Sequence, residues 1–187
     1  MSTLDNPIND STAASPWTTA TRFGGLTALV LIVLGLIGYL TGMTDPSNGT
    51  SSTSILFSVL SFVVWIGGVV MAVRAFKTEL GGFISFGEAF KSAFFTILVV
   101  SAISAVWTFV FYSFIATDFF ENILEFMRTT MEGQGLDDDA IDMAMGMYEK
   151  MYTPVGMLIL QLVMGLIGGG IVGLIIGAIM KKERPVT

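Results

Sequence analysis

Four long stretches of this chain contain no charged residue, and they constrain its fold more than any other feature. They cover residues 23–43, 55–73, 92–117 and 154–180. Each is about as long as the roughly 20 apolar residues that a helix needs to cross a bilayer core. Only helices and closed barrels satisfy every backbone group in lipid, and barrel strands show short alternating segments that are not seen here. The stretches therefore predict four transmembrane helices.

The expected architecture is an all-α membrane protein with one membrane domain, residues 21–183. The spans of its four-helix transmembrane bundle are expected at about 22–43, 55–76, 86–117 and 154–180. The preceding tail, residues 1–20, is rich in small and polar residues and is expected to be disordered in the cytoplasm. The first apolar stretch is too long and too late for a signal-peptide core, so we expect it to remain as an anchor.

Composition excludes several kinds of chemistry. The chain has no Cys and no His, which rules out thiolate and imidazole catalysis, zinc fingers and haem ligation by histidine. The net charge of −6 argues against a nucleic-acid partner, which needs a basic surface. No cluster of polar groups at one depth of the spans indicates a catalytic centre. The sequence therefore predicts neither an enzyme nor a bound cofactor or metal.

Lysine and arginine are distributed unevenly between the two expected faces of the membrane. One face, formed by the N-terminal flank, the second connection and the C-terminus, carries Arg22, Arg74, Lys77, Lys91, Lys181, Lys182 and Arg184. The other face carries only Arg128 and Lys150. Cytoplasmic loops are enriched in these residues. We therefore expect an inner-membrane protein with both termini in the cytoplasm.

The third connection, residues 118–153, is expected to be an acidic extracytoplasmic cap. It contains nine of the fifteen acidic residues: Asp118, Glu121, Glu125, Glu132, Asp137, Asp138, Asp139, Asp142 and Glu149. Two apolar stripes follow helical spacing, one formed by Phe119, Phe120, Ile123, Leu124, Met127 and Met131, the other by Ile141, Ala144, Met145, Tyr148, Met151 and Tyr152. A Gly-Gln-Gly break separates them. The pattern predicts an amphipathic helical hairpin that lies on the bundle or at the headgroup level.

The second connection, "TELGGFISFGEAFK", is the most patterned polar stretch. Ser85 and Glu88 have the spacing of a capping box, which predicts that the third helix starts near Phe86. Glu88 has an alternative interpretation as a proton relay or substrate contact, because ionisable groups at a membrane are often functional. The candidate motif residues are Gly82, Phe83, Ser85, Phe86, Glu88 and Phe90.

The last apolar stretch contains the letters of a dinucleotide fingerprint, "GGGIVG", at residues 168–173. A cofactor loop is rejected, because the stretch is uncharged throughout and the required acidic residue would fall beyond the last residue given. At period four, Gly165, Gly169, Gly173 and Gly177 form a small-residue ridge that favours close helix packing. We expect the ridge to be used inside the bundle, with contact between protomers as the alternative. Small faces that it could meet are Gly38-x-x-x-Gly42, Gly68-x-x-x-Ala72 and Ser101-x-x-x-Ala105. Gln161 is expected to hydrogen-bond another helix.

Two groups in the cap invite a metal hypothesis. Met143, Met145 and Met147, with Met151 nearby, offer thioethers of the kind that select copper(I). Helical geometry places Met145 on the opposite face from the others, and packing is the favoured interpretation. The aspartates at 137–139 and 142 suggest calcium, but the register of a calcium-binding loop fails.

Together these patterns resemble a known family. The run "GGFISFGEAFKSAFFT", an aromatic third span, "TDFFENILEF", the Gly-Gln-Gly break, "TPVG" and the ending "IIGAIMKKE" resemble the domain of unknown function 4199 family over about residues 20–183. In that family's pattern a proline often stands beside the aspartate after the third span, whereas here Asp118 follows Thr117. The resemblance implies a small bacterial four-span inner-membrane protein and supplies no catalytic residues.

The leading functional hypothesis is a non-catalytic scaffold, assembly factor or accessory subunit that acts through helix packing and partner contacts. Its partners are the lipid bilayer and either a membrane protein or further copies of the chain. The alternative is a small oligomeric transporter or channel for a small solute, with Gln161 and the glycine ridge near a solvated path. No charged residue lies deep in a span, which disfavours ion-coupled transport.

Overall fold

The computed structural model describes residues 15–44 and 51–182, and this part of the chain is all-helical. Its helices are α1 (Pro16–Leu40), α2 (Ser52–Glu79), α3 (Phe86–Phe114), α4 (Phe119–Gly133), α5 (Asp138–Met151) and α6 (Pro154–Met180). By length and composition, α1, α2, α3 and α6 are able to cross a membrane. The fold class predicted from the apolar stretches is therefore confirmed, and the chain is a multi-pass membrane protein.

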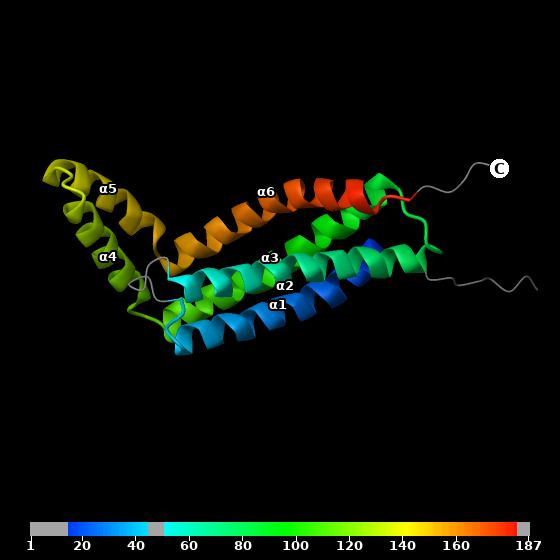
Figure 1. The fold of residues 1–187 in the computed structure, drawn as a ribbon, viewed down its shortest axis with the longest axis horizontal. Helices are drawn as coiled ribbons and strands as arrows, with labels where there is room; N and C mark the ends of the chain where they lie inside the picture. Colours follow the sequence, from blue (N-terminus) through cyan, green and yellow to red (C-terminus); the bar gives the residue numbers. More distant parts are fainter. Residues whose placement is uncertain (1–14, 45–50, 183–187) are drawn as a thin grey trace, which may run out of the picture.

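The four spanning helices run up and down as a bundle, and the α4–α5 hairpin projects from one end (Figure 1). We call this end, where α1 and α3 finish, the hairpin end. The opposite end, where the α2–α3 connection meets the finish of α6, is the loop end (Figure 1). Helix α3 is central, because it packs against α1, α2 and α6.

Several boundaries differ from those expected: α1 spans residues 16–40 where 22–43 was expected, α2 spans 52–79 where 55–76 was expected, and α3 ends at residue 114 where 117 was expected. Helix α1 begins at Pro16, so residues 16–20 of the expected disordered tail are helical, while residues 1–14 lie outside the described part. The cause is local: the Ser15 side chain caps the helix by accepting from Trp17 N–H, and proline is tolerated at the first helical position.

Helix α3 ends at Phe114 and does not reach Thr117. The N–H groups of Ile115 and Ala116 both donate to Phe111 O, at 2.8 and 2.9 Å, which closes the helix. The Thr117 hydroxyl then bonds the Asp118 carboxylate at 2.6 Å, and such residues favour turns over helix interiors. The helix break therefore occurs without a proline.

The buried apolar core lies toward the loop end. It is formed by Val69, Val73, Phe76, Ile84, Ala89, Ala93, Ile97 and Ile176, contributed by α2, the α2–α3 connection, α3 and α6. Most large apolar side chains elsewhere on the spanning helices are exposed, as expected for surfaces that face lipid. The cluster of buried apolar residues therefore lies at one end of the bundle.

Candidate functional sites

The glycine ridge of α6 lies directly against α3. A Cβ added at Gly169 would stand 3.2 Å from Ile97 Cγ2, and one at Gly173 would stand 3.2 Å from the Phe90 ring. At Gly177 the nearest atoms are in the Phe86 ring and the Phe90 backbone nitrogen, both at 3.3 Å. The absence of side chains on this ridge therefore allows α3 and α6 to approach closely.

The face of α3 that meets the ridge is a ladder of phenylalanines. Phe86 and Phe90 stack with ring centroids 6.4 Å apart, and Phe90 and Phe94 stack at 5.7 Å. Further along, Gly165 lies against Ser101. Among the three small faces considered as partners for the ridge, only the one containing Ser101 contacts it. Gly38 instead lies against Phe57 of α2 and Gly68 against Thr27 of α1, so these glycines build the α1–α2 contact.

The α2–α3 connection is a compact turn that joins this seam. Gly81 and Gly82 have φ of 77° and 87°, a region that glycine adopts readily. The Ser85–Glu88 capping box is formed: Glu88 Oε2 accepts from Ser85 N at 2.8 Å and from Ser85 Oγ at 2.7 Å. These bonds give Glu88 a structural role at the start of α3.

Three contacts tie this turn and the last turn of α2 to the end of α6. Ile84 and Lys182 exchange backbone hydrogen bonds of 2.9 and 2.8 Å, and the Ile84 side chain is buried in the core. The Lys182 ammonium lies 5.3 Å from the Phe83 ring centroid. Lys77 Nζ donates to the Met180 carbonyl at 2.9 Å, where a helix terminus favours a cation. The loop motif and the glycine ridge, treated as separate in the sequence, thus form one structural seam.

The hairpin forms by pairing α4 with α5. Phe120, Ile141 and Met145 are buried, and Arg128 bridges to Asp142 at 3.1 Å across the pair. At its base, the Phe119 and Phe120 rings also contact Tyr112 of α3. Of the two placements expected for the hairpin, the first, on the bundle, is not seen, because the hairpin projects from the end of the bundle (Figure 1). Its placement at the headgroup level stays a prediction.

The methionines of α5 are divided between two faces. Met145 is buried, whereas Met143 is 79% exposed and Met147 58% exposed. Packing therefore explains Met145, whereas Met143 and Met147 are not buried against other described residues of the same chain. In the described residues, no three His, Cys, Asp or Glu side chains are grouped closely enough to hold a metal ion.

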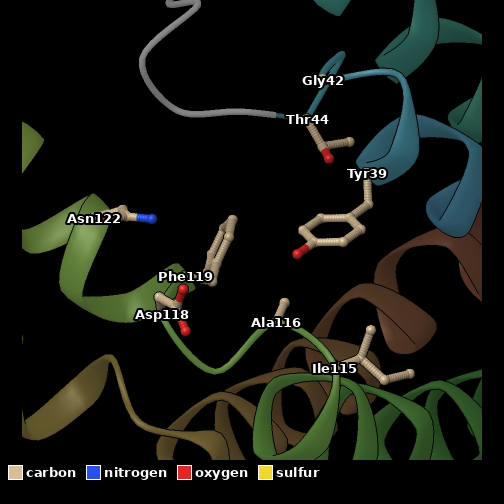
Figure 2. A pocket seen from close by; sticks show the side chains of 8 residues that line it. All are labelled: Tyr39, Gly42, Thr44, Ile115, Ala116, Asp118, Phe119 and Asn122. Atoms are coloured by element: carbon tan, nitrogen blue, oxygen red, sulfur yellow. The ribbon is translucent and has the colours of Figure 1, made fainter.

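Sequence reasoning missed a cavity at the hairpin end. Its inner part has a volume of about 430 Å³ and is lined by Leu31, Ile32, Gly35, Tyr39, Thr44, Ser104, Trp107, Thr108, Phe111, Tyr112, Phe119 and Gln161. Its outer part, about 140 Å³, is lined by Tyr39, Gly42, Thr44, Ile115, Ala116, Asp118, Phe119 and Asn122 (Figure 2). Three residues line both parts, so they adjoin; together we call them the hairpin-end cavity.

Among the residues that line this cavity, Gln161 is the one for which the sequence predicted a hydrogen bond to another helix. Its Oε1 accepts a hydrogen bond from Thr108 Oγ1 of α3 at 2.8 Å, which confirms the expected interhelical bond. Ser104 and Thr108 lie inside α3, whereas Tyr39 and Tyr112 lie near the ends of spans, where Tyr and Trp are common for reasons of membrane anchoring alone.

Comparison with known proteins gives one match. Residues 22–182 match the family described as "Protein of unknown function (DUF4199)". No curated protein and no solved structure matches the chain significantly.

Proposed function

The chain belongs to the DUF4199 family, whose description carries no activity, and on the physical evidence we propose that it is a non-catalytic accessory protein or scaffold of the inner membrane. In this proposal the hairpin is its docking element. Both termini lie in the cytoplasm and the hairpin lies outside. The spanning helices of the chain lie in the bilayer, and the chain contacts a membrane-protein partner.

The observation that carries the proposal is the projecting, strongly acidic hairpin. Most residues of its two apolar stripes are at least partly buried, whereas all nine of its acidic residues are exposed. Residues 118–153 contain nine acidic and two basic residues, a formal charge of −7 by subtraction. A surface of this kind steers and orients a partner of opposite charge. The proposed partner surface is therefore basic.

The charge distribution supports the proposed orientation. Arg22, Arg74, Lys77, Lys91, Lys181 and Lys182 belong to the loop end of the bundle, and Arg128 and Lys150 belong to the hairpin. Positive charge near span ends favours the cytoplasmic face. The loop end is accordingly the cytoplasmic end in this proposal.

The motif residues fit a structural role. Polar groups between Gly82 and Phe90 start α3 and hold the end of α6, as the Ser85–Glu88 and Ile84–Lys182 bonds illustrate. Proton transfer or substrate contact by Glu88 is not needed to account for its position.

The alternative, a small oligomeric transporter or channel, is favoured by one observation: Gln161 lines a cavity. Against it, the glycine ridge is filled by α3 side chains, and the buried core occupies the loop end of the described bundle. In the described part of a single chain the cavity does not extend through this core, so transport would require a second conformation or an assembly.

Crosslinking of a tagged full-length copy in its native membrane, followed by purification and quantitative mass spectrometry, tests the docking proposal. The variant Glu132→Lys/Glu149→Lys reverses two exposed charges, each in the last turn of a hairpin helix, where the helix dipole accepts a cation. Glu79→Lys is the matched control, because Glu79 is an exposed carboxylate in the last turn of α2 at the loop end.

The proposal predicts a protein recovered in near-equal amount with the parent chain and with the control, and lost with the hairpin variant. Recovery of the chain alone, or only with itself, contradicts the accessory role. Solute flux in liposomes then becomes the relevant assay for the alternative.

A further inference from the structure

The inner part of the hairpin-end cavity has the size of a ligand site. Its volume, about 430 Å³, falls within the range of roughly 300–1,000 Å³ that small-molecule pockets occupy. Toward the loop end it stops where the α3–α6 seam begins, because Ser104 lines the cavity while Ser101, one turn earlier, is packed against Gly165.

The cavity reaches into one half of the bilayer. Gln161 lies about 10 Å along α6 from Pro154, and Thr108 lies about 9 Å before the end of α3, at 1.5 Å per residue. Half of a hydrocarbon core is about 15 Å thick. The Gln161 and Thr108 side chains are therefore below the headgroup level, whereas Tyr39 and Tyr112 lie within two residues of the ends of α1 and α3.

Several hydrogen-bond donors that line the inner part have no protein partner. Within the described residues, no group accepts from the Gln161 amide nitrogen or from the hydroxyls of Tyr39 and Tyr112. Lipid tails offer no acceptor at this depth, and an unpaired polar group in hydrocarbon costs several kcal/mol. At its depth the Gln161 amide nitrogen therefore requires a polar occupant, either water or a ligand with acceptor atoms.

The charge and aromatic content of the walls select the kind of ligand. Among the described residues that line the cavity, Asp118 is the single charged one, and none is Lys or Arg. Aromatic rings from three elements surround the same space: Tyr39 of α1, Trp107, Phe111 and Tyr112 of α3, and Phe119 of α4. Ring faces and a carboxylate both attract cations, and neither compensates an anion.

The two parts of the cavity differ in polarity. Asp118, Asn122 and Thr44 line the outer part, and the Tyr39 and Phe119 rings lie on opposite sides of it (Figure 2). Leu31, Ile32 and Gly35 of α1 line the inner part opposite the aromatic face of α3. A ligand that fits both parts has a cationic head and an apolar body.

We propose that the hairpin-end cavity binds an alkylammonium group, with the ammonium head between the Asp118 carboxylate and the Tyr39 and Phe119 rings. The apolar body lies against α1 and α3, where the Gln161 amide donates to any acceptor atom it carries. The ligand is either a free amine from the aqueous phase or the headgroup of a membrane amphiphile. This binding is independent of the contact proposed for the hairpin charges, and each can fail without the other.

Fluorescence of Trp107 provides a direct readout. The full-length chain has three tryptophans, so Trp17→Phe and Trp65→Phe leave Trp107, in the cavity wall, as the sole reporter. The protein is held in dodecyl maltoside micelles, which contain no ammonium group. It is titrated with tetramethylammonium, with dodecyltrimethylammonium, and with dodecanoate as an anionic control that has a chain of similar length; sodium chloride matches the ionic strength.

The expected result is a saturable change in Trp107 emission with at least one ammonium probe and a weaker response to dodecanoate. Asp118→Asn is expected to raise the Kd of that probe by about fivefold, as for a partly exposed charge contact. Asp139→Asn is the matched control, because Asp139 is exposed in α5 and does not line the cavity; its Kd stays at the parent value. Unchanged thermal unfolding shows that both variants are folded.

Binding of tetramethylammonium identifies a free amine as sufficient, and binding of dodecyltrimethylammonium alone identifies a membrane amphiphile. No saturable response to either probe overturns the proposal. It is equally overturned if dodecanoate binds as tightly as the ammonium amphiphile, or if Asp118→Asn leaves the Kd unchanged.

Discussion

The close approach of α3 and α6 makes one substitution unusually informative. A methyl group at Gly165 would place a carbon 2.6 Å from Ser101 Cβ, whereas two carbons in contact need about 3.5–4.0 Å. The Ser101 Cβ is fixed by the α3 backbone and cannot rotate away. The helices must therefore separate locally by about 1 Å, the difference between those two distances.

We expect Gly165→Ala to destabilise the bundle by about 1–3 kcal/mol, the usual range for overpacking. Gly168→Ala is the matched control on the same helix, since nothing lies within 4 Å of a Cβ added there. The control is expected to be neutral or stabilising by up to about 1 kcal/mol, because alanine favours helix more than glycine does. Equilibrium unfolding in mixed micelles, followed by tryptophan fluorescence, measures both.

A compensating substitution sharpens the test. Ser101→Gly removes the atom that Gly165→Ala meets, so the double variant is expected to recover part of the loss when compared with each single variant in a double-mutant cycle. Equal stabilities for Gly165→Ala and Gly168→Ala, or a cycle with no coupling, would refute the claim that this seam determines the spacing of α3 and α6.

Three further predictions use the same unfolding assay. Gly82→Ala forces alanine to φ near +87° and is expected to cost about 1–2 kcal/mol, while Gly87→Ala, in an open helical position, costs nothing measurable; equal effects would contradict the turn. Ser85→Ala removes the cap of α3 and is expected to cost about 0.5–2 kcal/mol, with Ser85→Thr retaining most of the stability. Thr108→Val removes the hydrogen bond to Gln161 and is expected to cost about 0.6 kcal/mol; no loss, or the same loss in a Gln161→Leu background, would show that the bond does not contribute.

The four spans were predictable because lipid leaves the backbone few alternatives: an uncharged apolar stretch of sufficient length must be helical to satisfy its own polar groups. The start of α3 was predictable for a local reason, since Ser85 and Glu88 close a capping box with near neighbours. Span ends that depend on one or two side chains, such as Ser15 before α1 and Phe114 at the end of α3, were misplaced by a few residues.

The sequence contains a periodic pattern for each side of the α3–α6 contact, but it does not show that the two patterns pack together. On α3 a phenylalanine recurs every four residues, at Phe86, Phe90 and Phe94, and on α6 a glycine recurs at the same interval, at Gly169, Gly173 and Gly177. Neither pattern indicates which helix its residues contact. Antiparallel packing brings them into register, with Phe86 at Gly177 and Phe94 at Gly169. The pairing depends on the topology of the bundle, which local periodicity does not contain.

The hairpin-end cavity was not predictable from pattern. It depends on how α1, α3, α4 and α6 leave space between them, and the lining residues are spread from Leu31 to Gln161. Gln161 alone carried a signal, as the single polar side chain of its span, and that signal indicated a hydrogen bond without indicating a cavity.

The central claim of this account is that the two ends of the bundle differ. The loop end is basic, contains the buried core and lies in the cytoplasm, whereas the hairpin end is acidic, contains the hairpin-end cavity and lies outside. The absence of native cysteines permits a direct measurement: labelling of single-cysteine variants by a membrane-impermeant maleimide in spheroplasts of a bacterial host. Thr129→Cys reports the hairpin and Glu79→Cys the loop end, and both positions are exposed. We predict labelling of Thr129→Cys in intact spheroplasts and of Glu79→Cys only after the membrane is opened; the reverse pattern would contradict the account.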